Sequence, residues 1–282
     1  MALPHWFVKL IMKLFPRRFF LAKFTRIPGI RKIAEELLFK DDEIYYLPLD
    51  SVISKENVNK KKIVINKKLE ETIDLVIPSQ VINHFIDKSK YRWVMNFCLC
   101  RTANNCEAYP HELGCLFLGE AVLDINPAYG KLVTKEEAKE HIVKGQKQGL
   151  IHLIGRNKID SQWLNVGPGD KLLTICQCCE CCCLWKMVPD VDVKISRSLV
   201  RMPGVSVNIN DNCVACGDCT DEICIVNAIT MLEKKAYINQ NHCKGCGRCV
   251  TVCQYDAITM TIKNQNFVEE TISNIANKVD VS

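Results

Sequence analysis

The feature that most constrains this chain is the placement of its cysteines. The 282 residues include 18 cysteines, and none of them stands alone. With 48% hydrophobic residues the chain is long enough to build a hydrophobic core without cross-links, which excludes disorder and a collagen-like repeat. The cysteines form four tight groups: Cys98, Cys100, Cys106 and Cys115; Cys176, Cys178, Cys179, Cys181, Cys182 and Cys183; Cys213, Cys216, Cys219 and Cys224; and Cys243, Cys246, Cys249 and Cys253.

Metal binding explains these groups better than disulfides do. The apolar residues near the start are interrupted by Lys9, Lys13, Arg17 and Arg18, so the uninterrupted apolar segment of a secretory signal is missing. We therefore expect a cytoplasmic protein, in which thiols stay reduced and clustered cysteines bind metal. No apolar stretch approaches the roughly 20 residues that a membrane-spanning helix needs.

The positive charge is concentrated in residues 1–40. This segment holds nine Lys or Arg against Glu35 and Glu36, a local net charge of +7 in a chain whose total is +5. Its apolar side chains recur at helical spacing, and Pro16 is expected to kink or end the helix. Two interpretations stay open: an amphipathic arm whose residues 1–24 contact a membrane surface, or a helix that covers the core or a partner subunit. The apolar set is Leu3, Trp6, Phe7, Leu10, Ile11, Leu14 and Phe15.

The rest of the chain predicts an α+β fold in which helices and strands alternate irregularly. Ser79 is expected to be the N-cap of a helix, Thr134 and Glu137 form a capping box, and a strand from Lys171 to Ile175 leads into the second cysteine group. A short strand is expected at Ile63–Ile65. We expect four segments: an arm (1–40), a central cysteine-rich domain (41–200), a two-cluster domain (201–265) and a tail (266–282) with a short docking helix.

Residues 207–262 contain an internal repeat. The run Cys213-x2-Cys216-x2-Cys219-x4-Cys224 is followed 30 residues later by Cys243-x2-Cys246-x2-Cys249-x3-Cys253, and Ala-Ile-Thr-Met follows each run. These residues resemble the bacterial-type ferredoxins that carry two 4Fe–4S clusters. A zinc site would explain one C-x2-C pair but not eight cysteines in a duplicated pattern.

The resemblance implies how the eight cysteines would be shared. In that family the fourth cysteine of each run ligates the other cluster. Carried over, one cluster would be held by Cys213, Cys216, Cys219 and Cys253, and the other by Cys243, Cys246, Cys249 and Cys224. The chain departs from the family at Ile225 and Gln254, which replace the usual proline, and by one extra residue before Cys224.

The ten central cysteines are all candidate metal ligands, but their grouping stays open. Cys98, Cys100, Cys106 and Cys115 suffice for one cubane cluster. In the run from Cys176 to Cys183, strand alternation would turn Cys176 and Cys178 to one side and Cys179 to another. Either two cubanes share the ten thiols, or a larger or site-differentiated cluster uses the surplus, or some thiols are redox-active. A structural zinc or iron–sulfur knot is the simpler alternative.

Four other polar residues near these cysteines are weaker candidates for a reductive site. Arg101 would bind cluster sulfide or an anion, whereas His111, Glu112 and His152 would donate protons. The arrangement of the central cysteines, with Gly-Leu-Ile-His at 149–152 between the two groups, resembles uncharacterised ferredoxin-fused iron–sulfur proteins of anaerobic archaea and bacteria, a resemblance that implies no particular activity. No nucleotide-binding glycine fingerprint or acyl-transfer triad is present, a flavin is left open, and no nucleic-acid partner is expected.

These observations favour a multi-cluster iron–sulfur protein that relays single electrons between a ferredoxin-type domain and one or two central clusters, with a redox partner protein. The first alternative is an oxidoreductase whose substrate binds at a site-differentiated central cluster. The second is a cluster-based redox sensor or interaction protein.

Overall fold

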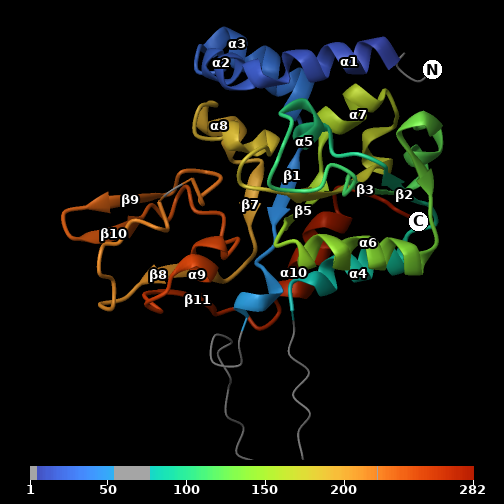
Figure 1. Ribbon diagram of the computed structural model, residues 1–282. Helices are drawn as coiled ribbons and strands as arrows, with labels where there is room; N and C mark the ends of the chain where they lie inside the picture. Colours follow the sequence, from blue (N-terminus) through green and yellow to red (C-terminus); the bar gives the residue numbers. More distant parts are fainter. Residues whose placement is uncertain (1–4, 54–76, 221) are drawn as a thin grey trace, which may run out of the picture.

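The structure, a computed structural model, describes residues 5–53, 77–220 and 222–282, and its fold is α+β, as the sequence predicts (Figure 1). Its centre is a seven-stranded sheet in the order β4-β2-β3-β6-β5-β1-β7. Neighbouring strands are antiparallel except β1 and β7, which are parallel. The strands are β1 (Glu43–Tyr46), β2 (Arg92–Met95), β3 (Leu116–Leu118), β4 (Gly130–Leu132), β5 (Ile151–Arg156), β6 (Leu173–Cys178) and β7 (Leu199–Arg201).

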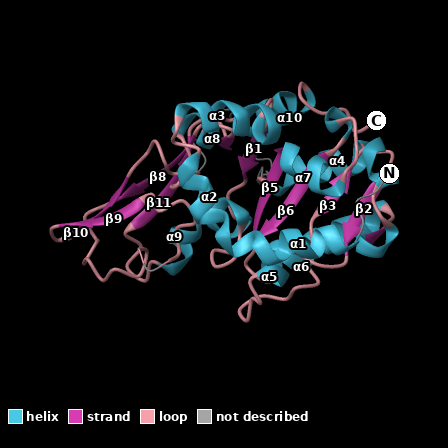
Figure 2. Ribbon diagram, turned by 90° about the horizontal axis from the view of Figure 1, so that it is seen from above, coloured by secondary structure: helices cyan, strands magenta, loops and turns pink. Residues whose placement is uncertain are grey.

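Helices cover both faces of this sheet (Figures 1 and 2). On one face lie α4 (Ser79–Lys88), α6 (Lys135–Lys147) and α10 (Phe267–Ala276). The other face carries the N-terminal arm and several short helices. The arm consists of α1 (His5–Leu14), η1 (Phe15–Arg17), α2 (Arg18–Phe24), α3 (Pro28–Ala34) and η2 (Glu35–Phe39), and the short helices include α5 (Leu99–Ala103), α7 (Lys158–Leu164), η7 (Leu184–Met187) and α8 (Val193–Ser196).

Alternation along the strands divides the core into two sides. Leu116 and Leu118 of β3 pack with the α4 and α6 side chains, whereas Phe117 between them packs with Val8 of α1. In β5, Ile154 faces the α4 side and Leu153 faces the opposite side. The side chains of one strand therefore serve two separate layers, and the cysteines of β6 follow the same rule.

Most of the local predictions for the central region agree with the structure. The Thr134 hydroxyl accepts from Glu137 N (3.2 Å), and Glu137 accepts in return from Thr134 N (2.8 Å), so the predicted capping box opens α6. Ser79 is the first residue of α4 and not its N-cap, a position that Pro78 occupies without a side-chain cap. The strand predicted for Lys171–Ile175 is β6, which begins two residues later, at Leu173, and extends through Cys178. The strand expected at Ile63–Ile65 lies outside the described residues.

The arm is helical, and α1 ends just before Pro16, as expected from the missing N–H of proline. No helix within residues 5–53, 77–220 and 222–282 is both long enough and apolar enough to cross a bilayer. The tail forms α10, whose Phe267, Thr271 and Ile275 are buried against the side of the sheet that α4 covers.

The repeat unit at the C-terminal end forms two small sheets. β8 (Val205–Ile209) pairs with β11 (Ile258–Ile262), and β9 (Ile229–Leu232) pairs with β10 (Lys235–Ile238). The first strand of one repeat thus pairs with the last strand of the other. A short helix, α9 (Arg248–Val252), lies in the second repeat. This unit projects from the side of the central sheet where β7 lies (Figures 1 and 2).

Candidate metal centres

Each repeat surrounds a small cavity with cysteines from both repeats. Four cysteines line the first cavity, and three of them belong to the first run: Cys213, Cys216, Cys219 and Cys253. We call these the first ferredoxin site. The second ferredoxin site is likewise lined by three cysteines of the second run and one of the first: Cys224, Cys243, Cys246 and Cys249. Soft thiolates arranged four to a site suit iron–sulfur clusters or zinc.

Left-handed backbone positions recur at equivalent places in the two repeats. Ala215 (φ 61°) and Gly245 (φ 68°) precede the second cysteine of each run, and Gly217 (φ 93°) and Gly247 (φ 84°) follow it. A Cβ at Gly247 would lie 2.7 Å from a Val52 methyl carbon, so only glycine fits there without a shift. These turns direct successive thiols of a run toward one point.

Backbone N–H groups contact two of these sulfurs. Ala228 N donates to Cys224 Sγ (3.2 Å), and Ala236 N donates to Cys213 Sγ (3.5 Å). Donors of this kind stabilise a thiolate and tune the cluster that it ligates. Burial raises the pKa of the Cys246 thiol to about 12, so an occupying cation has to provide the charge that keeps this sulfur deprotonated.

The central cysteines divide into two groups that differ from the division suggested by their order in the chain. Cys106 leaves the other three cysteines of its run and joins Cys179, Cys181 and Cys182, and all four sulfurs lie within 4.8 Å of one another. Cys106 Sγ and Cys181 Sγ are 3.5 Å apart. We call this the four-cysteine group. A tetrahedral metal with bonds of about 2.3 Å to sulfur separates its ligand atoms by about 3.8 Å. The four sulfurs therefore fit around one metal ion in their present positions, and they would fit a cubane cluster if they moved further apart.

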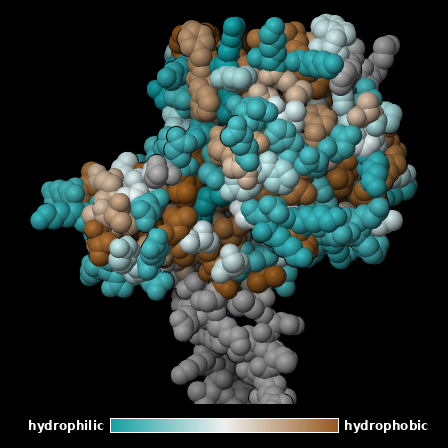
Figure 3. All heavy atoms as spheres, in the orientation of Figure 1, coloured by the Kyte–Doolittle hydropathy of each residue, from teal (hydrophilic) through white to brown (hydrophobic). Residues whose placement is uncertain are grey.

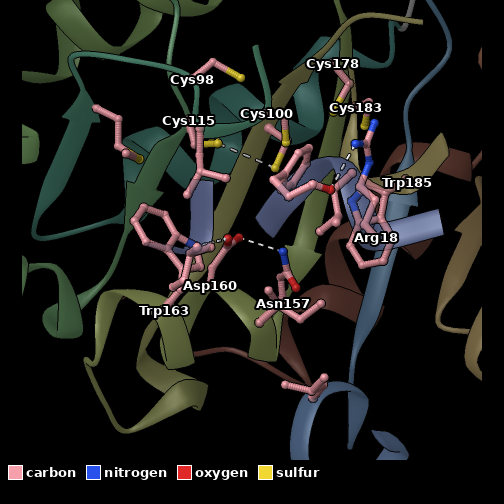
Figure 4. Close-up of a pocket in the computed structure, with 18 of the residues that line it drawn as sticks. Arg18, Cys98, Cys100, Cys115, Asn157, Asp160, Trp163, Cys178, Cys183 and Trp185 are labelled. Carbon is pink, nitrogen blue, oxygen red and sulfur yellow. Dashed lines mark hydrogen bonds between the residues drawn. The ribbon is translucent and has the colours of Figure 1, made fainter. Parts of the chain in front are cut away.

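The other six central cysteines line a cavity of about 360 Å³ beneath the N-terminal arm (Figure 4). Cys115 Sγ lies 3.7 Å from Cys176 Sγ. A hydrogen bond from the Cys100 thiol, together with the charge of Arg101, lowers the pKa of Cys98 to about 6. The set, which we call the six-cysteine cavity, comprises Cys98, Cys100, Cys115, Cys176, Cys178 and Cys183.

Strand geometry explains how neighbouring cysteines enter different groups. Cys176 and Cys178 lie on one face of β6 and line the cavity, as the alternation predicts. The chain then turns, and Cys179 belongs to the four-cysteine group, as does Cys182. Cys183, the next residue, lines the cavity again. The two central groups therefore adjoin one another along the backbone.

Polar side chains that the sequence does not single out also line the cavity. Arg18 of the arm is 6% exposed, and its guanidinium donates to Cys182 O (3.4 Å) and Asn104 Oδ1 (3.3 Å). Asp160 accepts from Asn157 Nδ2 (2.7 Å) and from Trp163 Nε1 (2.8 Å), and burial raises the pKa of its carboxyl. Figure 4 shows these residues around the labelled cysteines. In the sequence, Arg18 follows Phe15 by three positions and precedes Ala22 by four, so the three residues share one face of a helix. This position among apolar residues is the sequence signal that Arg18 is buried.

The weaker candidates have other partners. Arg101 is fully buried, and its guanidinium donates to the carbonyl oxygens of Pro110 (2.9 Å), Gln177 (2.8 Å) and Leu113, which fixes the loop after α5 against β6. His111 Nε2 lies 2.8 Å from Cys106 O, next to the four-cysteine group, and Glu112 is exposed.

His152 does not reach the six-cysteine cavity. In the register of β5 and β6 it lies opposite Gln177, and it therefore shares the face that Cys176 and Cys178 avoid. Burial lowers the pKa of its imidazole to about 4. This histidine is thus a neutral group on the far side of the sheet.

An ion pair joins the second ferredoxin site to the four-cysteine group. Arg248 stands between Cys246 and Cys249, and Glu180 stands between Cys179 and Cys181. The Arg248 guanidinium donates to the Glu180 carboxylate and to Gly149 O (2.9 Å), and the Tyr109 hydroxyl donates to the same carboxylate (2.9 Å).

Tyr46 lies between the second ferredoxin site and the six-cysteine cavity. Its side chain is 1% exposed and lines the ferredoxin site, and it interacts electrostatically with Cys178 and Cys183 of the cavity. The pKa of its phenol is raised mainly by burial and further by the charges of these two thiols. Its hydroxyl has no hydrogen-bond partner among the described residues, so it is free to donate to a group bound in the site.

Comparison with known families identifies one part of the chain. A family model for a 4Fe-4S binding domain matches residues 236–259, the segment that contains Cys243, Cys246, Cys249 and Cys253. A comparison with curated proteins finds no significant match. The domain match, taken with the cysteine content, points to an iron–sulfur protein of ferredoxin type and supports at least one 4Fe–4S cluster in the C-terminal region.

Proposed function

We propose that the chain is a multi-cluster electron-transfer protein, in which two ferredoxin-type 4Fe–4S clusters exchange single electrons with metal–sulfur clusters in the central domain. Bound clusters would supply the one-electron chemistry, and the protein supplies thiolate ligands, burial and hydrogen bonds that tune them. A redox partner protein would deliver or remove the electrons.

The proposal assigns crossed ligand sets to the ferredoxin part. Its support is that each cavity of the repeat is lined by three cysteines of one run and the fourth cysteine of the other. The two sites are also close neighbours, since Cys249 of one interacts electrostatically with Cys219 of the other. The extra residue before Cys224 is accommodated without withdrawing that thiol from its site.

The proposal assigns one cluster to the four-cysteine group and one to the six-cysteine cavity. Four convergent thiols support the first assignment. Six thiols around about 360 Å³ support the second, because they exceed the four ligands of a cubane and favour a larger or site-differentiated cluster. Buried Arg18 and Arg101 interact electrostatically with thiols of both groups and would offset part of the negative charge of a thiolate-rich site.

The single observation that carries an electron relay is the contiguity of the four sites. The second ferredoxin site contacts the four-cysteine group through Arg248 and Glu180, and it contacts the six-cysteine cavity through Tyr46. The two central groups adjoin at Cys178-Cys179 and at Cys182-Cys183. Every site therefore has a neighbour within one or two side chains, which short electron transfers require.

Anaerobic iron and sulfide analysis tests this assignment. The loaded chain is expected to hold roughly sixteen irons, whereas about eight would restrict clusters to the ferredoxin part and refute the central sites. Cys181→Ser should remove iron from the four-cysteine group alone, and Cys178→Ser from the cavity alone. Loss of the same spectral signal in both variants would show that the ten cysteines hold one site.

A second candidate function, a reductase with its substrate at the cavity cluster, is favoured by one observation. The six-cysteine cavity places the buried carboxyl of Asp160, whose pKa is raised, near thiols that would ligate the cluster. A carboxyl group with a raised pKa beside a reduced cluster suits proton delivery to a bound small molecule.

Exogenous cyanide, a ligand for an open iron position, tests the reductase. A new electron paramagnetic resonance signal that is absent from Cys178→Ser would support it. An unchanged spectrum with full iron occupancy would leave every iron saturated by protein ligands and exclude substrate binding at the cluster.

A further inference from the structure

The outer surface of the N-terminal arm carries a concentration of exposed apolar side chains. Eleven of the nineteen large exposed hydrophobic residues of the described chain lie between Trp6 and Leu38. Three of them are more than 60% exposed: Trp6, Phe20 and Ile33. We propose that residues 6–38 form a platform that docks on the surface of an anionic lipid bilayer. The other eight residues are Leu10, Leu14, Leu21, Phe24, Ile27, Ile30, Leu37 and Leu38.

The platform is held in place from its inner side. Val8 and Phe15 are buried, and Arg18 donates its hydrogen bonds to groups of the central domain. Further back, Arg26 donates to Pro189 O (2.7 Å), and the Thr25 hydroxyl accepts from Asp192 N (2.9 Å). The arm therefore already covers the core with one side, and its exposed apolar residues form a second surface that meets the cavity only at Leu14, Leu21 and Leu38.

Basic residues are interleaved with the apolar ones. Lys9, Lys13, Arg17, Lys23 and Lys32 are all exposed on the arm. In Figure 3 teal and brown side chains alternate along the upper edge of the molecule, where Figure 1 places the arm. A surface that binds the bilayer interface places its apolar side chains at the boundary between headgroups and acyl chains. Its cations lie beside them, at the level of the headgroups.

Charge favours a bilayer over a protein as the occupant. The buried centre of a protein interface is depleted in lysine, but here lysines lie among the apolar residues. A second copy of the chain would bring two segments of net charge +7 together, which is repulsive. Anionic headgroups instead neutralise these cations while the acyl region takes up the apolar side chains.

The platform also borders the six-cysteine cavity. Leu14, Leu21 and Leu38 are exposed on the arm and at the same time line the cavity. Docking would therefore turn this side of the cavity toward the lipid. A ligand that entered beside these residues would come from the apolar side of the interface.

Vesicle flotation with the full cluster-loaded chain under anaerobic conditions tests the proposal. The chain should float with vesicles of phosphatidylcholine and phosphatidylglycerol, bind pure phosphatidylcholine at least tenfold more weakly, and bind less as salt rises. The triple variant Trp6→Ser, Phe20→Ser, Ile33→Ser should lose at least tenfold in affinity. Lys9→Glu, Lys13→Glu, Lys23→Glu should lose the preference for anionic vesicles.

A matched control separates docking from general stickiness. Leu132, Val193 and Leu232 are also about half exposed or more, and they lie outside the arm. Their triple serine variant should bind vesicles like the unmodified chain, with unchanged cluster absorbance in all variants. The proposal is overturned if the two triple serine variants lose binding equally. It is also overturned if the chain does not bind anionic vesicles and instead self-associates through the arm.

Discussion

The Arg248 guanidinium and the Glu180 carboxylate form a hydrogen-bonded ion pair between two cysteine loops that are 68 positions apart in the chain. Arg248 directly precedes Cys249 and follows Cys246 by two positions, and Glu180 lies directly between Cys179 and Cys181. The Arg248 side chain is 8% exposed and that of Glu180 19% exposed, so water screens the pair only weakly.

Removing the charge of Glu180 is expected to destabilise the fold. Glu180→Gln leaves Arg248 buried without its counter-charge, and we expect a loss of about 2–4 kcal/mol in the free energy of unfolding. Denaturant unfolding of the loaded protein, followed by cluster absorbance, measures it. Glu222→Gln is the control, because Glu222 pairs with Lys186 but is 77% exposed and should cost under about 1 kcal/mol. Equal losses in the two variants would contradict a special role for the buried pair.

Crossed ligation in the ferredoxin part predicts which cysteine variants resemble each other. Cys253→Ser should remove the same paramagnetic signal as Cys213→Ser, and Cys224→Ser the same signal as Cys243→Ser, because each pair lines one cavity. Redox-poised electron paramagnetic resonance distinguishes the two clusters. If Cys253→Ser instead matched Cys243→Ser, each run would hold its own cluster.

The Tyr46 hydroxyl is expected to tune the cluster of the second ferredoxin site. Tyr46→Phe should lower the reduction potential by roughly 20–60 mV, the equivalent of a hydrogen bond of about 0.5–1.5 kcal/mol that favours the more negative reduced cluster. Its neighbour Tyr45 is the control, since its hydroxyl is already bound to Glu43. A redox titration that gave identical potentials for Tyr46→Phe and the unmodified chain would refute this role.

Asp42 predicts a specific pH dependence of stability. Burial raises the pKa of its carboxyl to about 7, opposed by the hydrogen bond from Lys158 N and the charge of Arg156, while Asp160 adds to the shift. The folded state therefore binds more protons than the unfolded state between about pH 4 and pH 7, and stability falls as pH rises through this range. Asp42→Asn should flatten that fall between about pH 4 and pH 7 in thermal unfolding. Parallel curves for the two proteins would count against a raised pKa.

Local sequence signals predict local structure well in this chain. The capping box at Thr134, the end of α1 before Pro16 and the alternation of Cys176 and Cys178 each depend on residues within a few positions. The spacing of the repeat likewise agrees with the finding that the first three cysteines of each run line one cavity, because a C-x2-C-x2-C loop with left-handed turns converges on itself.

The grouping of the central cysteines depends instead on tertiary contacts. Cys106 joins Cys181 and not Cys98, because Arg101 fixes the loop after α5 against β6 and so brings Cys106 to the second cysteine run. Arg18 comes to these groups from the arm, and Tyr46 from a strand on the other side of β5. No spacing rule in the sequence connects residues so far apart, and a lone buried Arg or Tyr looks like an ordinary core residue until its neighbours are known.

The division of the central cysteines between two distant runs has a consequence for biogenesis. Neither the run from Cys98 to Cys115 nor the run from Cys176 to Cys183 contains a complete central group. Both runs would therefore have to be synthesised before either group could accept metal. The Glu180 carboxylate, between two cysteines of the four-cysteine group, accepts its hydrogen bond from Arg248 of the C-terminal repeat. Metal insertion into either central group would thus follow the synthesis of both runs, residues 98–183.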